Sequence, residues 1–157
     1  MLTLSKLMIN NYLNLELLKF DPLIKENIRL WSIDLTLGNT LAICKSNNAV
    51  LDVEEFKSID DEKFDILNIE DGYILSPGET VTGFSKESIK LPQNINGLIL
   101  NLDHLAMLGI DATISQYITP GFIGHKRIVI VNKSTQKIKI KPGITICTLV
   151  LLRMGVE

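Results

Sequence analysis

The chain has 157 residues, of which 46% are hydrophobic and 22% are charged, a composition typical of one globular domain with a substantial core. A formal net charge of −2 without a strongly basic segment argues against a nucleic-acid-binding protein, because phosphate neutralisation needs clustered lysine and arginine. No apolar run approaches the roughly 20 residues of a membrane-spanning helix. We therefore expect a single domain over residues 1–157 that has neither nucleic acid nor a membrane as partner.

The N-terminal segment predicts a short helix followed by extended chain. Ser5 can cap a helix over residues 6–14, in which apolar residues recur near helical spacing. Asp21 precedes Pro22, which disfavours helical backbone at that position and predicts an extended segment.

From Ile28 onward the apolar residues recur with a period of two. The segment WSIDLTLGN (31–39) predicts a strand that ends in a turn at Gly38-Asn39, with a paired strand starting at Leu41. Residues 46–71 are polar and acidic and predict a surface excursion with one short strand.

The second half of the chain repeats a strand, Pro-Gly, strand pattern. Pro-Gly pairs at 77–78, 120–121 and 142–143 separate short β-prone segments, and Pro92 and Gly97 flank another. The lysine-rich run 133–143 alternates with apolar residues, as on the solvent-exposed face of a strand.

One internal segment is helical in character. LDHLAMLG (102–109) predicts a short helix with Gly109 at its C-terminal end. The whole pattern predicts an all-β sandwich or barrel of the jelly-roll kind, with a short N-terminal helix and this one internal helix.

The two cysteines, Cys44 and Cys147, lie far apart in apolar surroundings, and we expect both to be small core residues. Without an N-terminal signal peptide the sequence predicts a reduced, cytoplasmic protein. A zinc site of the nucleobase deaminase type needs a Pro-Cys-x-x-Cys motif, which is absent. We therefore expect no metal site formed by the protein alone.

Six colinear segments resemble the dCTP deaminase branch of the dUTPase-like family. The resemblance implies a distorted jelly roll of the β-clip barrel type that assembles as a homotrimer, with active sites between subunits. It also implies action on pyrimidine deoxynucleotides, by deamination of dCTP to dUTP or dUMP or by hydrolysis of dUTP. The segments are LSKLMINNYLN (4–14), SIDLTLGN (32–39), LSPGETVTGFSKESIKLPQNINGLI (75–99), LAMLGI (105–110), ITPGFIGH (118–125), and Asn132 followed by IKIKPGITICTL (138–149).

The residues that carry chemistry in this family are replaced here. Its second signature, Gly-Arg-Ser-Ser-Leu-Ala-Arg, corresponds to residues 101–107. Leu102 and Met107 stand at the two arginine positions, which the resemblance assigns to nucleotide binding. Asp103 and His104 stand at the two serine positions, of which one serves the chemistry and the other a phosphate.

The base that activates water is also replaced. The family's catalytic glutamate lies seven residues beyond the aromatic residue after the Pro-Gly turn, and Val129 stands there. A valine side chain cannot move a proton. The aspartate that precedes this Pro-Gly pair in the family corresponds to Thr119, and the family's C-terminal tail, which closes over the nucleotide, has no counterpart before Glu157.

Three further residues have competing interpretations. In the dUTPase branch the aspartate comparable to Asp34 lies near metal-bound phosphates, whereas we favour a structural role for it here. His125 follows Gly124, where the family often places a histidine, and we interpret it as structural. Trp31 is interpreted as a core or subunit-interface aromatic.

Two functional hypotheses remain. The first is a non-catalytic homotrimer that keeps the fold for binding, regulation or assembly. The alternative is an active dCTP deaminase or dUTPase that uses an altered constellation around Asp103 and His104. A deoxynucleotide is the candidate ligand, Mg²⁺ is expected only with a bound nucleoside triphosphate, and the sequence indicates no particular protein partner.

Overall fold

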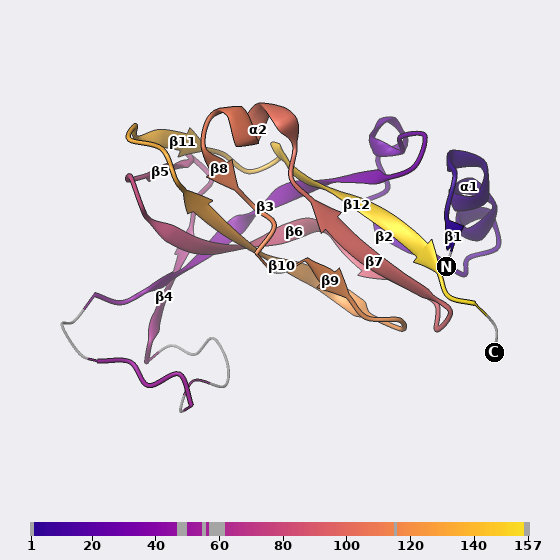
Figure 1. Cartoon of the computed structure of the whole chain (residues 1–157), viewed down its shortest axis with the longest axis horizontal. Coiled ribbons are helices and arrows are strands. Elements are labelled where there is room, and N and C mark those ends of the chain that lie inside the picture. Colours follow the sequence, from indigo (N-terminus) through magenta and orange to yellow (C-terminus); the bar gives the residue numbers. More distant parts are fainter. Residues whose placement is uncertain (1, 47–49, 55, 57–61, 115, 156–157) are drawn as a thin grey trace.

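The structure is a computed structural model that describes residues 2–46, 50–54, 56, 62–114 and 116–155. Within those residues the chain is mostly β (Figure 1). The helical elements are α1 (Lys6–Asn14), the 3-10 turn η1 (Lys25–Asn27) and α2 (Asp103–Met107). The strands are β1 (Leu2–Thr3), β2 (Lys19–Asp21), β3 (Ile33–Cys44), β4 (Phe64–Asn68), β5 (Tyr73–Leu75), β6 (Thr80–Lys90), β7 (Ile95–Leu100), β8 (Ile110–Asp111), β9 (Tyr117–Ile118), β10 (Ile123–Asn132), β11 (Ile138–Ile140) and β12 (Thr145–Arg153).

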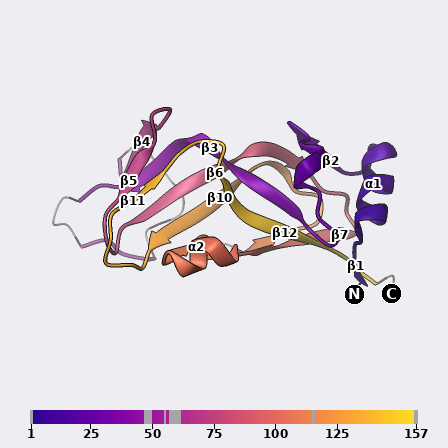
Figure 2. The same cartoon turned by 90° about the horizontal axis from the view of Figure 1, so that it is seen from above.

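The strands pair antiparallel in one large, curled sheet and one two-stranded sheet (Figures 1 and 2). The order in the large sheet is β8-β10-β6-β3-β12-β7-β9, with β1 added to β12, β2 to β6 and β4 to β3, while β11 pairs with β5. Ile9 of α1 and Leu105 of α2 are buried in the same apolar core as the strands. The predicted all-β architecture with a short N-terminal and a short internal helix is therefore confirmed.

The local predictions for the N-terminal segment are also confirmed. Helix α1 covers the predicted residues, and the Ser5 side chain accepts a hydrogen bond from the backbone N–H of Met8 at 3.4 Å. The extended segment expected around Asp21 is β2, which pairs with β6.

Each Pro-Gly pair lies between two strands, as predicted. The glycines Gly78, Gly121 and Gly143 have φ values of +78°, +74° and +83°, in the left-handed region that favours glycine. Gly97, by contrast, does not flank a strand but lies inside β7, where the side chains of Leu149 and Ile118 approach its backbone.

The prediction of a turn at Gly38-Asn39 is wrong, because β3 continues through it to Cys44. Leu37 pairs with Ser85 and Leu41 with Gly83. An advance of four residues along β3 therefore lies opposite an advance of only two residues along β6. The extra residues form a bulge rather than a reversal. At Gly38 a Cβ atom would lie 3.0 Å from the Phe84 carbonyl oxygen, so glycine permits this close approach of the two backbones.

The first half of β3 pairs with β12 and the second half with β6 and β4, so β3 belongs to two parts of the curled sheet. The N–H of Leu37 donates to the Ile144 carbonyl on the β12 side, so the N–H of Thr36 points to the opposite edge. There the buried Glu87 carboxylate accepts it at 3.0 and 3.2 Å and also accepts the Thr36 hydroxyl at 2.6 Å. A side chain thus takes the place of a strand partner.

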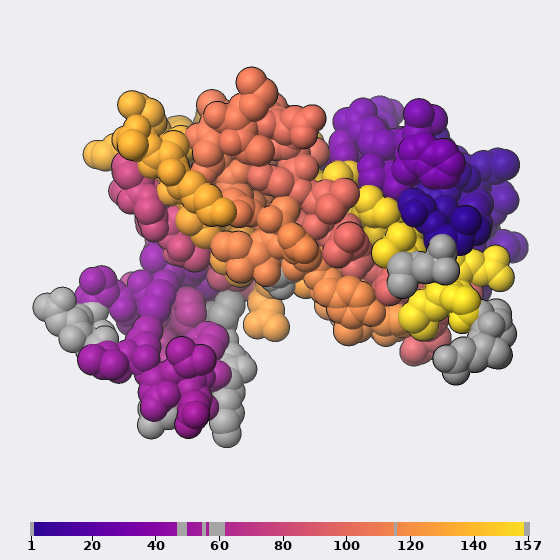
Figure 3. Space-filling view, in the orientation of Figure 1, coloured from indigo at the N-terminus to yellow at the C-terminus, as the bar shows by residue number. Residues whose placement is uncertain are grey.

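The surface excursion contains one short strand, β4, as predicted. With residues 50–54 it forms an arm that projects from the body of the protein (Figures 1 and 3). The parts of the predicted excursion at 47–49, 55 and 57–61 lie outside the described residues. In the lysine-rich run, β11 alternates buried and exposed positions with Lys139 exposed, which confirms that prediction.

The prediction of two core cysteines holds for one of them. Cys147 on β12 is fully buried, and burial raises the pKa of its thiol to about 12. Cys44 is exposed, because β3 has left the body and entered the arm where this residue lies. Trp31 is 58% exposed, so it is not a core residue of the single chain.

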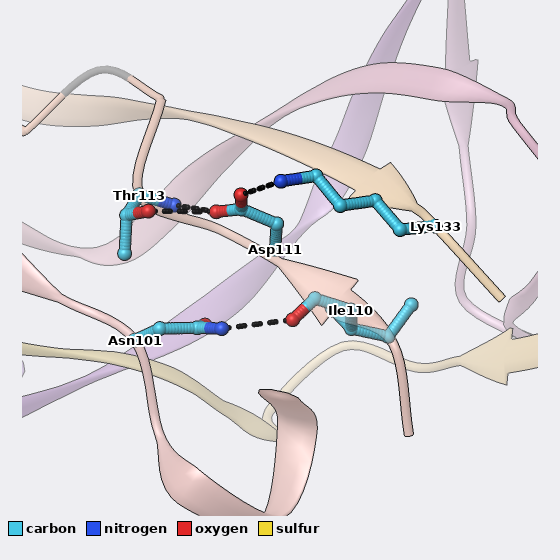
Figure 4. A network of polar contacts seen from close by, with 5 residues as sticks. All are labelled: Asn101, Ile110, Asp111, Thr113 and Lys133. Carbon is cyan, nitrogen blue, oxygen red and sulfur yellow. Dashed lines mark hydrogen bonds and ion pairs between the residues drawn. The ribbon is translucent and has the colours of Figure 1, made fainter. Parts of the chain in front are cut away.

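A polar network holds the two ends of the α2 segment (Figure 4). Before the helix, the Asn101 side-chain amide donates to the Ile110 carbonyl at 2.8 Å, which closes the loop over α2. After it, Asp111 pairs with Lys133 at 2.5 Å and accepts the hydroxyl and the backbone N–H of Thr113 at 2.7 and 2.9 Å. The bond from Lys133, with those from Thr113, lowers the pKa of Asp111 from 3.8 to about 2.

Replacing Glu87 tests its role as a substitute strand partner. In Glu87→Ala the N–H and hydroxyl of Thr36 lose their buried acceptor, so we expect the free energy of unfolding to fall by about 2–4 kcal/mol. Glu70→Ala, which removes an exposed carboxylate, should change it little. Chemical denaturation at one fixed protein concentration measures both, and equal effects of the two variants would contradict the assigned role.

Asp111 predicts a pH dependence of stability. Its folded pKa lies below the unfolded value, so its stabilisation is fully present above pH 3.8 and is lost as the pH falls through about 2. Asp111→Asn should lower the free energy of unfolding at neutral pH by about 1 kcal/mol, since solvent screens the exposed Lys133. The difference in the free energy of unfolding between Asp111→Asn and the wild-type protein should disappear as the pH is lowered. A difference that stays constant with pH would contradict this role of Asp111. So would an equal loss of stability in the control Asp71→Asn, which changes an exposed aspartate.

Candidate functional site

A pocket of about 370 Å³ lies between the segment before β3, the start of α2 and the strand β12. It gathers three of the six predicted site residues, Asp34, Leu102 and His104. The remaining lining residues are Arg29, Ser32, Thr145 and Thr148.

The strongest interaction in this pocket is the ion pair between Arg29 and Asp34. One carboxylate oxygen of Asp34 accepts from Nε of Arg29 at 2.7 Å and lies 2.6 Å from Nη2. Asp34 is only 5% exposed, whereas the Arg29 side chain reaches solvent. A buried carboxylate needs such a partner. The pair ties the segment that follows η1 to β3, which supports the structural interpretation of Asp34.

Thr148 adds an unused polar atom to the pocket. Its position on β12 pairs with Asp34 on β3, so the two residues are neighbours across the sheet. Its hydroxyl is buried and has no hydrogen-bond partner within the described residues. This hydroxyl is therefore an unsatisfied buried polar group beside the pocket.

The residues of α2 and its flank do not converge on one point. Asp103 and His104 are both exposed, but only His104 lines the pocket. Asp103 lies in the first turn of the helix, where a carboxylate interacts favourably with the free N–H groups. Leu102 is half-buried against the core, and Met107 is 88% exposed. In this placement Asp103 is a polar residue at the start of the helix.

Val129 lies on β10, opposite Thr82 of β6. The neighbouring Ile128 and Ile130 are buried in the core, so the half-buried Val129 faces the other side of the strand. Val129 does not line the pocket beside α2. Within one chain, the position of the family's base and the α2 pocket are therefore separate.

The sequence analysis did not identify several charged residues that have specific partners in the fold. Arg29 joins Asp34 only through the fold, and no sequence signal singled it out. Glu87 and Lys126 are buried charged residues. Alternation along β6 places Glu87 among inward-facing residues, a signal that was available. The Lys126 ammonium donates to the Tyr117 carbonyl at 3.0 Å, which ties β9 to β10, and burial lowers the pKa of this lysine.

The described ranges contain no group of three or more histidine, cysteine, aspartate or glutamate side chains that could hold a metal ion. Over the same part of the chain, no helix has the length and apolar character required to cross a bilayer.

Comparison with solved structures identifies the fold. A dCTP deaminase from Agrobacterium tumefaciens superposes with a TM-score of 0.75 at 18% identity, covering 98% of this chain and 48% of that one, so this chain spans about half its length. The EIAV dUTPase matches with a TM-score of 0.50 at 20% identity, over 65% of this chain and 83% of that one. The curled sheet is thus the distorted jelly roll of this fold class.

Sequence comparison identifies the family. The dCTP deaminase-like family model matches residues 3–154. The dUMP-forming dCTP deaminase of Nanoarchaeum equitans is 32% identical over 150 residues, which cover 86% of this chain and 76% of the relative. That of Persephonella marina is 28% identical over 137 residues, covering 87% and 76%. The chain belongs to the dCTP deaminase-like family.

Proposed function

We propose that this chain is a non-catalytic member of the dCTP deaminase-like family, which uses the jelly roll as a cytoplasmic binding or regulatory homotrimer. The observation that carries the proposal is Val129. The position that the resemblance assigns to the water-activating glutamate holds a hydrocarbon side chain on β10, with Thr82 as its cross-strand neighbour. Neither residue is a base able to generate hydroxide from water at neutral pH.

The surroundings of α2 support the same proposal. A triphosphate carries several negative charges and needs cations or backbone N–H groups to receive it. Leu102 and Met107 offer neither at the family's arginine positions, and the exposed Asp103 adds a negative charge nearby. In the α2 pocket the cationic lining residue is Arg29, and its guanidinium already forms an ion pair with Asp34. The surroundings of α2 therefore lack the charged groups that tight nucleotide binding requires. We expect Mg²⁺ only together with a bound triphosphate.

Two features support the homotrimer: exposed apolar side chains, and the distance in the fold between Val129 and the α2 pocket. Leu30 and Trp31 are 71% and 58% exposed, and Met107 and Leu108 next to the pocket are 88% and 57% exposed. Such surface is favourable when another subunit covers it. A site shared between subunits also agrees with the separation of Val129 from the α2 pocket within one chain.

One observation favours the alternative of an active enzyme. His104, the only histidine in the pocket lining, opens onto the same space as Asp34, and an imidazole can exchange protons at neutral pH. Any such activity would use a constellation different from that of the family.

Turnover measurements separate the two functions. We expect no release of ammonia or pyrophosphate above the blank when the purified protein is incubated with dCTP or dUTP, with and without Mg²⁺, because the base is absent. The protein should have the mass of three chains in solution; a monomer would contradict the homotrimer. Turnover that disappears in His104→Ala would establish the altered constellation and overturn the non-catalytic proposal.

Restoring the lost cations tests why nucleotide binding should be weak. The double variant Leu102→Arg/Met107→Arg should bind dCTP at least tenfold more tightly than the wild-type chain, because each guanidinium adds a charge-assisted contact to phosphate. Leu108→Arg/Ile114→Arg is the matched control, since it adds the same two charges at exposed residues outside the family's arginine positions. Calorimetry across all deoxynucleotides measures these affinities. Equal tightening by the control would show a general charge effect, and tight wild-type binding would contradict the argument.

A further inference from the structure

A cavity of about 630 Å³ lies apart from the α2 pocket and shares no lining residue with it. Its walls come from the bulged part of β3, the middle of β6, the start of β10 and the turn between β11 and β12. None of the sequence-predicted site residues lines it. Its volume falls in the range of about 300–1,000 Å³ that is typical of sites for small organic molecules.

Two coincident bulges create this cavity. On one side of β6, the register with β3 slips between Leu37 and Leu41. On the other side, the register with β10 slips between His125 and Arg127. Bulges redirect side chains and leave backbone groups without ladder partners, and they recur beside functional sites.

The strand between the bulges is held in place by Ser85. Its hydroxyl donates to the Glu87 carbonyl at 2.7 Å and accepts the N–H of Lys126 at 2.8 Å. The turn from β11 is fixed as well, because the N–H of Gly143 donates to the Leu37 carbonyl at 2.7 Å. The cavity therefore has walls that are ordered without a ligand, which lowers the entropic cost of binding.

His125 is oriented by the same serine. Its Nδ1 lies 2.8 Å from the Ser85 carbonyl oxygen. A carbonyl only accepts hydrogen bonds, so Nδ1 carries the proton and Nε2 is left for another partner.

The charges around the cavity have one sign. Lys86 lines it beside His125, and none of the lining residues that the structure describes is acidic. Arg127 is exposed on the same side of β10 as His125, since the residue between them is buried. The rest of the lining includes apolar surface from Phe84 and Pro142.

We propose that this cavity binds a small organic anion, whose apolar part packs on Phe84 and Pro142 and whose acidic group lies between Lys86 and His125. The acidic group is a carboxylate or a phosphate ester, both of which accept hydrogen bonds from the Lys86 ammonium. The proposal does not depend on whether the α2 pocket is catalytic.

Titration of the full-length, isotope-labelled protein with benzoate and with phenyl phosphate tests this site by nuclear magnetic resonance. Saturable shifts should appear on the His125 ring and on the amides of Gly38 and Gly143. The probe that binds more tightly identifies the acidic group. Neutral benzamide should bind at least fivefold more weakly than benzoate, because it lacks the charge.

Lys86→Ala should weaken binding of the tighter probe by about fivefold, whereas Lys90→Ala, which removes an exposed charge from the same strand outside the cavity, should leave it unchanged. Both lysines are exposed, so neither variant should unfold the protein. No saturable shift with either probe up to its solubility limit would overturn the proposal. So would equal binding of benzamide, or equal losses in the two lysine variants.

Discussion

The Glu87 carboxylate accepts the backbone N–H of Thr36 at the place where β3 parts from β6, and the curled sheet depends on this bond. A strand that changes neighbours leaves backbone groups without partners, and leaving them unpaired inside the protein is costly. Here a buried side chain takes over, and the adjoining bulge carries β3 on toward the arm. The cavity between β3, β6 and β10 lies beside this divergence, so the shape of the sheet also shapes its walls.

The proposed function implies that this chain keeps the scaffold of its family without the chemistry. Residues that form turns and pack the core are in place: the three Pro-Gly turns, the cap at Ser5 and the buried Asn132, whose side chain binds the carbonyls of Leu75 and Gln136. The positions that the resemblance assigns to nucleotide binding and to the base hold the uncharged residues Leu102, Met107 and Val129. Turn and core residues are required for stability in every member of a fold, whereas site residues are required only while the reaction is performed.

Much of the local structure was predictable from particular residues. Ser5 and the apolar spacing after it predicted α1 to the residue, and Gly109 marked the end of the α2 segment. The failures involve partners far along the chain. Gly38-Asn39 has the composition of a turn, but Leu37 and Leu41 on either side of it pair with Ser85 and Gly83 of β6, so the chain passes through as a bulge. Arg29 was not recognised as the partner of Asp34, because a pairing of residues five apart in irregular chain has no periodic signal.

The sequence by itself determined the family, the all-β class and the two helices, because each depends on residue identity or on short-range pattern. The tertiary structure alone decided which of the replaced residues share a pocket, that Cys44 is exposed while Cys147 is buried, and that Lys86 and His125 line one cavity. These outcomes depend on strand register and on where a sheet curls. A slip of one residue reverses the face of every side chain, so they are set by contacts between distant segments and not by local preference.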